Sequence, residues 1–381
     1  MGSVYTLFLT LGLLASGVSI PLILTFQNHQ PVNQSTNDPP EYFAQPLLQT
    51  AMIFLGEIVC ILAIQVASKT PVLLDRSLLQ AVAPQQQQQQ QQSNHQQPSS
   101  QQQQQQQPTR GVGDHPDWAS VTNRSTSSWA LTWFIVPSAC DLIATTLMNL
   151  GLIYSTASIF QMVRSSIVGF SAIFSLIFLS RRFLGHEWGA VAAILIGTTL
   201  ICMQDDWVGP AYLCVAQLFV AGQFVLEEYL MDRYRLDPVK AMGIEGAFGT
   251  VLLVVALGVA TAANLGDMRE GMMQLFDAYV LWQSALVLAL MVAMFNFFGL
   301  AVSSSVGVPG RSVIDTFRTV LIWVIAIHYG WDTFSWLQLA GFVVLVLGVF
   351  VFNGVFSCVR QYVSHHASGN ARNGESAPLL S

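Results

Sequence analysis

Charged side chains are scarce in this sequence. Only 9% of its 381 residues are Asp, Glu, Lys or Arg, whereas 52% are hydrophobic. Soluble domains carry about 25% charged residues, so the composition excludes most soluble enzymes. The formal net charge of -6 argues against a nucleic-acid partner, which favours a basic surface. We expect neither a cofactor nor a metal ion.

Cysteines are also few, and none lies in a segment expected to form a luminal loop. All five lie in or beside apolar segments, so no disulfide framework is expected. They are Cys60, Cys140, Cys202, Cys214 and Cys358.

Long apolar runs are abundant instead. Runs of about 20 residues, enough to cross a bilayer as a helix, recur along nearly the whole chain. They predict an all-α polytopic membrane protein with ten spans. The first run lacks a basic n-region and a clear cleavage site, so we expect a retained span. The predicted spans are 4–26, 47–67, 129–150, 156–180, 187–204, 209–230, 243–264, 277–299, 307–328 and 334–356.

The basic residues outside these spans are distributed unequally between the two sides. With a cytosolic N-terminus, eleven Lys and Arg residues fall on the cytosolic side and only Arg269 on the luminal side. Cytosolic loops are enriched in such residues. The asymmetry therefore predicts an even number of spans and two cytosolic termini.

One cytosolic loop, residues 68–128, has a different composition. It contains the glutamine tracts Gln85–Gln92 and Gln101–Gln107, separated by Ser, Pro and Asn. Such a segment buries too little apolar surface to offset its ordering entropy, so disorder is expected. It is interpreted either as a tolerated insertion or as a dedicated binding segment.

Two glycosylation sequons test this topology. The sequon at Asn33 falls in the lumen and the one at Asn123 in the cytosol, so only Asn33 is expected to carry a glycan. A glycan on Asn123 would contradict the orientation.

Two segments of the chain share a sequence pattern. Gly151-Leu152 precedes Trp188 by 37 residues, counted from the glycine, and Gly299-Leu300 precedes Trp336 by the same interval. The offset of 148 residues relates spans three to five to spans eight to ten. Because each half then has an odd number of spans, the halves cross the membrane in opposite senses, as in many secondary transporters. Chance similarity between two hairpins is the alternative.

The repeat divides the chain into three parts. The first half covers residues 1–204 with the insertion, the second covers 205–358, and residues 359–381 form a cytosolic tail.

Several charges lie inside the predicted spans, where each costs roughly 2.5–3.5 kcal/mol on translocon scales. Asp141 and Arg164 lie on successive helices about a turn near residue 154. Their heights differ by about one helical turn, so an ion pair is geometrically reasonable. The pair could bind substrate or simply join two helices.

Glu57 lies at the centre of its span and has no partner nearby in the sequence. On span nine, Arg311, Asp315 and Arg318 share one helix face, with Arg311 near enough to the cytosolic end to snorkel. If Asp141 pairs with Arg164 and Asp315 pairs with Arg318, Glu57 is the one buried acid without a basic partner. A spare buried carboxylate can carry a proton, so proton coupling is a hypothesis.

Three further acids lie near the cytosolic face. Glu227 and Glu228 close span six, and Glu245 opens span seven. These residues are interpreted either as an inner gate or as an ordinary interfacial charge cluster.

The sequence resembles the drug/metabolite transporter superfamily, and more narrowly the F-type members of solute carrier family 35 and chloroquine-resistance-transporter-like proteins. The strongest motif runs from Ser155-Thr156-Ala157-Ser158 through Gln161-Met162-Val163-Arg164 to Arg181-Arg182. Further motifs are Gly56-Glu57, Pro137-Ser138-Ala139-Cys140-Asp141, Leu226-Glu227-Glu228 and Gly243-Ile244-Glu245-Gly246-Ala247-Phe248-Gly249.

The resemblance implies two inverted five-helix halves, alternating access and a central cavity lined by spans one to four and six to nine. Two features depart from it: no luminal cysteine bridge is available, and the cavity lacks the strongly basic character expected for nucleotide sugars. The residues that would face the cavity are Glu57, Asp141, Asn149, Gln161, Arg164, Asn296, Asp315 and Arg318.

The tail resembles an acidic dileucine sorting signal, with Glu375 four residues before Leu379-Leu380. Cytosolic adaptors read such signals, which implies a lysosomal or vacuolar membrane.

The sequence therefore predicts a secondary-active transporter of a small-molecule substrate, embedded in lipid and compatible with a homo-oligomer. A transport-inactive scaffold or receptor and an intramembrane enzyme are the competing hypotheses.

Overall fold

The computed structural model describes residues 2–33, 41–69, 131–179, 183–204, 206–234, 236, 238–263 and 268–355. The glutamine tracts, Arg181-Arg182 and the sorting signal lie outside these residues. The described chain consists of α-helices, their connections and one antiparallel hairpin of β1 (Pro31–Asn33) and β2 (Glu41–Tyr42).

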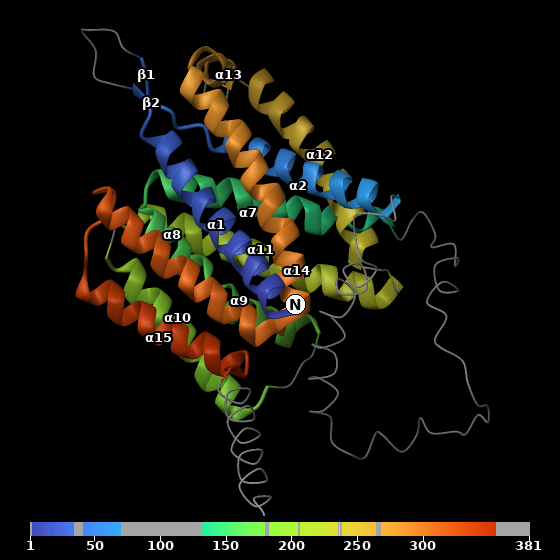
Figure 1. Cartoon of the computed structure of the whole chain (residues 1–381), viewed down its shortest axis with the longest axis vertical. Coiled ribbons are helices and arrows are strands. Elements are labelled where there is room, and N and C mark those ends of the chain that lie inside the picture. Colours follow the sequence, from blue (N-terminus) through green and yellow to red (C-terminus); the bar gives the residue numbers. More distant parts are fainter. Residues whose placement is uncertain are drawn as a thin grey trace, which may run out of the picture.

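The helices form one bundle (Figure 1). Their bounds are α1 Gly2–Asn28, α2 Pro46–Lys69, α7 Ile135–Ile153, α8 Ala157–Arg164, α9 Ile167–Phe178, α10 Gly185–Cys202, α11 Val208–Tyr234, α12 Pro238–Ala262, α13 Met268–Asp277, α14 Tyr279–His328 and α15 Trp336–Phe352.

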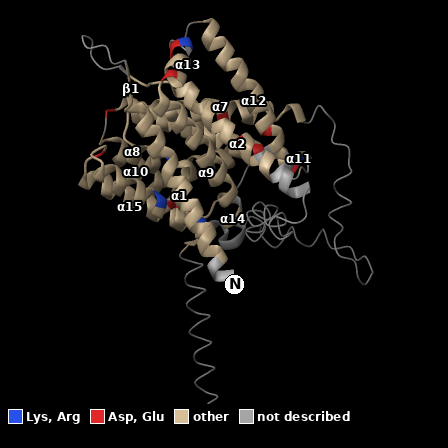
Figure 2. Ribbon diagram, turned by 45° about the horizontal axis from the view of Figure 1, so that its top comes forward, with Lys and Arg blue, Asp and Glu red and all other residues tan. Residues whose placement is uncertain are grey.

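Within the described residues, seven helical segments are long and apolar enough to cross a membrane, and two shorter apolar helices accompany them. Large apolar side chains on their outer surface are exposed, including Phe8, Ile177 and Leu286. Few charged residues interrupt this surface (Figure 2). A bundle with such a surface requires an apolar surrounding, so the chain is an integral multi-pass membrane protein.

The predicted spans 277–299 and 307–328 belong to one helical run, α14, rather than to two separate helices. This run nevertheless reverses direction. Arg311 Nη1 donates a hydrogen bond of 2.9 Å to the Gly299 carbonyl. In a straight helix these residues would lie about 18 Å apart along the axis, beyond the reach of an arginine. Figure 1 shows the two arms of α14 meeting at a sharp angle near the N-terminal end of α1.

The short helix α13, between α12 and α14, was not predicted. Its ten residues, MREGMMQLFD, alternate polar and apolar types too closely to form a span. It buries Gly271 and Leu275 and leaves Met273 and Phe276 exposed.

Helices α10 and α15 pack against each other along one edge of the bundle (Figure 1). A Cβ on Gly197 would lie 2.6 Å from the Gly341 carbonyl oxygen, and one on Gly348 would lie 2.8 Å from the Ala190 carbonyl. Gly197 of α10 meets Gly341 of α15, whereas the earlier residue Ala190 meets the later residue Gly348, so the two helices are antiparallel. Only glycine permits so close an approach of two backbones.

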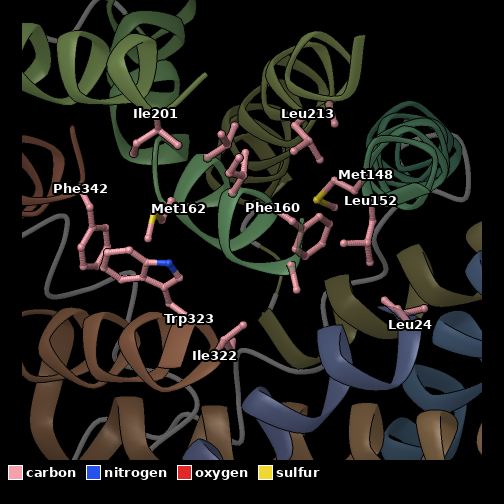
Figure 3. Packing of buried hydrophobic residues seen from close by; sticks show 14 of the residues in the cluster. Leu24, Met148, Leu152, Phe160, Met162, Ile201, Leu213, Ile322, Trp323 and Phe342 are labelled. Carbon is pink, nitrogen blue, oxygen red and sulfur yellow. The ribbon is translucent and has the colours of Figure 1, made fainter. Parts of the chain in front are cut away.

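The centre of the bundle is the two-turn helix α8. Phe160 packs toward Met148 and Leu152 of α7, whereas Met162 faces Trp323 of α14 and Phe342 of α15 (Figure 3). Residues 157–163 are all buried. This apolar packing fixes the position of the polar residues that α8 also carries.

Candidate functional site

The turn predicted near residue 154 is present and orients α8. Helix α7 ends at Ile153, and the Thr156 hydroxyl accepts a hydrogen bond from the Ile159 amide at the start of α8. Helix α8 then ends at Arg164, because Ser165 and Ser166 separate it from α9. The Ser166 hydroxyl donates to the Val163 carbonyl at 2.6 Å, which competes with the regular helical pattern. Arg164 therefore lies at a break in a membrane helix.

Four carboxylates from four helices form the acidic cluster: Glu57 of α2, Asp141 of α7, Glu227 of α11 and Glu245 of α12. Glu57 interacts electrostatically with Asp141 and Glu227, and Glu245 interacts with Asp141 and Glu227. Asp141 also accepts a hydrogen bond of 3.3 Å from the Thr145 hydroxyl. The first and last of these residues, Glu57 and Glu245, lie 188 positions apart in the sequence, and the fold brings them together.

Two members of the acidic cluster contact each other directly. Glu227 and Glu245 share a side-chain hydrogen bond, and Gln223 Nε2 donates to Glu245 Oε1 at 3.0 Å. A hydrogen bond between two carboxyl groups requires that one of them holds a proton. Glu227, Glu228 and Glu245 are all half-buried.

Three guanidiniums and one carboxylate form the arginine cluster: Arg164 of α8 with Arg311, Asp315 and Arg318 of α14. Asp315 lies 3.7 Å from Arg311 Nε and 3.4 Å from Arg318 Nη2. The predicted Asp315–Arg318 pair is therefore present. Arg164 interacts electrostatically with the other three members of the cluster.

The predicted Asp141–Arg164 ion pair is wrong. No hydrogen bond or ion pair within 4.0 Å joins these two residues in the described chain, although they interact electrostatically at longer range. Residue counting along two helices says nothing about the direction in which each side chain points, and that direction decides the contact. Asp141 faces the acidic cluster, and Arg164 faces α14.

Arg311 also differs from its prediction. Rather than snorkelling to the interface, its guanidinium turns back to the Gly299 carbonyl and to Asp315. The reversal of α14 places the carbonyl within reach.

Every member of the two clusters is half-buried. The two clusters meet through Arg164, which interacts electrostatically with Glu57 and Asp141 on one side and with Arg318 on the other.

Three other predicted site residues have different surroundings. Asn149 is buried and donates to the Thr50 hydroxyl at 3.0 Å. Gln161 is 2% exposed, and its Oε1 has no hydrogen-bond partner among the described residues. Asn296 is half-buried on the first arm of α14. The proposed glycan site, Asn33, ends strand β1.

Sequence reasoning missed a polar network at the end of the bundle where α1 meets α2. Gln49 Nε2 donates to Asn28 Oδ1 at 2.8 Å, and Gln27 Nε2 donates to Ser284 Oγ at 3.0 Å. Beside it, Asn149 of α7 donates to the hydroxyl of Thr50, the residue that follows Gln49. These uncharged residues occur at helix ends, where polar side chains are common, so no single one stood out.

Comparison with known proteins identifies relatives of the chain. Solute carrier family 35 member F6 of Rattus norvegicus is 29% identical over 271 residues, which cover 65% of this chain and 73% of the relative. The protein of the same name from Pongo abelii is 32% identical over 246 residues, covering 58% and 66%. The chain is a solute carrier family 35 homologue.

The resemblance predicted from the motifs is thus confirmed for the family. An uncharacterized protein of Schizosaccharomyces pombe is 29% identical over 237 residues, covering 58% of this chain and 73% of that protein. No protein-family model matches the chain. Solute carrier relatives and a bundle of apolar helices favour a membrane transporter over an enzyme.

Proposed function

We propose that this solute carrier family 35 homologue is a secondary-active transporter that moves a small metabolite by alternating access. The observation that carries the proposal is the pair of opposite charge clusters inside the bundle. Charged groups within a membrane are costly and mark substrate or ion pathways. Here they come from α2, α7 and α8 in the first half and from α11, α12 and α14 in the second.

Two inverted halves, residues 1–204 and 205–358, form the proposed moving parts. The reversal between α7 and α8 and the reversal within α14 occupy matching positions of the sequence repeat. The antiparallel packing of α10 on α15 agrees with halves of opposite orientation. The polar network that joins α1, α2 and α14 would close one end of the pathway.

Proton coupling is part of this proposal. The shared hydrogen bond of Glu227 and Glu245 holds a proton inside the bundle, and Glu57 lies within electrostatic range of Glu227. Glu57, Asp141, Glu227, Glu228 and Glu245 would exchange protons and gate the pathway, while Gln161, Arg164, Asn296, Asp315 and Arg318 would contact the substrate.

Location and topology are proposed from the sequence features alone. Both termini would be cytosolic, Asn33 would carry a luminal glycan, and the Glu375–Leu380 signal would direct the protein to a lysosomal or vacuolar membrane.

Purified full-length protein in liposomes tests transport. The liposomes are loaded with a mixed metabolite extract, and saturable counterflow of labelled metabolites is measured by mass spectrometry. Exchange that disappears in empty liposomes and saturates with substrate supports the proposal. Lack of counterflow across the whole panel would favour a transport-inactive scaffold.

A further inference from the structure

Arg164 is a half-buried cation without a hydrogen-bond or ion-pair partner among the described residues. Its side chain makes no hydrogen bond or ion pair with another described residue, although a guanidinium has five donors. Arg164 interacts electrostatically with another cation, Arg318. Two guanidiniums inside a membrane bundle repel each other strongly, because the low dielectric screens them poorly.

Arg318 is held in a fixed orientation. Its guanidinium carbon lies 5.1 Å from the centre of the Phe295 ring, and its Nη2 contacts Asp315. Its side chain is only 12% exposed, and its Nε has no hydrogen-bond partner among the described residues. Arg318 therefore keeps unused donor capacity while its position is already determined.

The charges of the arginine cluster do not balance. Among these four residues, Arg164, Arg311 and Arg318 face the single carboxylate of Asp315, whose ion pairs are with Arg311 and Arg318. Asp141 lies outside the cluster, makes no ion pair with Arg164 among the described residues and accepts a hydrogen bond from Thr145. An additional anion at this point would remove the repulsion and supply the missing acceptors.

We propose that a small organic anion binds between Arg164 and Arg318, so that the transported substrate carries a carboxylate or phosphate group. The inference rests on the proposed transport function. Guanidiniums bind both groups through paired hydrogen bonds.

Binding is tested on the full-length protein in detergent, where no transport is required. Thermal unfolding is followed with sodium succinate, sodium phosphate or choline chloride, each against sodium chloride of equal ionic strength. At concentrations about tenfold above the dissociation constant, one of the two anions should raise Tm by roughly 2–5 °C. A Tm shift with succinate indicates a site for a carboxylate, and a shift with phosphate indicates a site for a phosphate group.

The variants Arg164→Gln and Arg318→Gln should abolish the shift. Arg164→Lys should keep part of it, and Arg233→Gln, at an exposed site on α11, should keep all of it. Without added anion, Arg164→Gln should unfold at the same or a higher temperature, because it relieves the repulsion from Arg318. That result also shows that the variant folds.

Three outcomes would overturn the site: no shift with either anion, a shift that persists in Arg164→Gln, or a shift with choline chloride alone. A shift that depends on both arginines in a protein without counterflow would reject the transporter and keep the anion site. Counterflow of neutral or cationic metabolites only would reject the site and keep the transporter.

Discussion

The Ser158 hydroxyl donates a hydrogen bond to the Asp332 carboxylate, although the two residues lie 174 positions apart. Thr156 donates to the same carboxylate at 3.4 Å, and Gln338 Nε2 donates to Ser158 at 2.9 Å. The carboxylate thereby faces the N-terminus of α8, where a negative charge is favourable. This contact joins the helix that carries Arg164 to the connection between α14 and α15.

Replacing Asp332 with Ala should destabilise the protein. It leaves the buried Ser158 and the half-buried Thr156 without their acceptor, which costs about 1–3 kcal/mol. Thermal unfolding should show a Tm lowered by several degrees. Asp332→Asn keeps one acceptor oxygen and should lose less. Asp277→Asn, at an exposed site on α13, serves as the matched control, and an equal loss there would contradict the role of Asp332.

Helix positions were largely predictable from the sequence, because apolar runs of membrane length have few alternative structures. The turn between α7 and α8 and the start of α10 also matched. The continuous helix through the reversal of α14 was not predictable, since the sequence suggested a break where the backbone stays helical. Short α13 falls below the length at which an apolar run is recognised.

The candidate site was predictable in composition but not in pairing. A charged residue within a span stands out whatever its partner is, so Glu57, Asp141, Arg164, Asp315 and Arg318 were all found. The position of a residue along its helix can be counted from the sequence, whereas the direction of its side chain around the helix axis is set by how the helices pack. For that reason the sequence paired Asp141 with Arg164, and the structure assigns them to different clusters.

Replacing Glu57 with Gln tests proton coupling. The variant keeps the size and a hydrogen-bonding amide but cannot release a proton. Counterflow or uptake of the transported metabolite should become independent of a pH difference across the liposome membrane, while the wild-type rate changes with it. Glu270→Gln, on α13, should behave as wild type. Unchanged pH dependence in Glu57→Gln would show that this carboxylate does not couple transport to protons.

Replacing Gly197 with Leu should disrupt the contact between α10 and α15. A side chain there meets the Gly341 carbonyl and the Leu345 amide at 2.6 Å, and neither backbone can yield without separating the helices. Forced overpacking typically costs about 1–3 kcal/mol. Gly258→Leu on α12 is the control, since a Cβ there meets no atom within 4 Å. Unfolding monitored by circular dichroism should show a lower Tm for the first variant only.

Replacing Arg311 with Met should loosen the reversal of α14. The variant keeps the apolar stem but loses the hydrogen bond to the Gly299 carbonyl and the contact with Asp315. Loss of a charged hydrogen bond costs about 1.5–3 kcal/mol. Of the two ion pairs of Asp315, only the one with Arg318 then remains. We expect a lowered Tm and faster proteolysis near residues 299–311. Arg311→Lys keeps the charge and can still reach one acceptor, so it should lose less. Arg269→Met, on exposed α13, should leave both measurements unchanged. A stable Arg311→Met variant would mean that packing of α1 against α14 suffices to hold the two arms together.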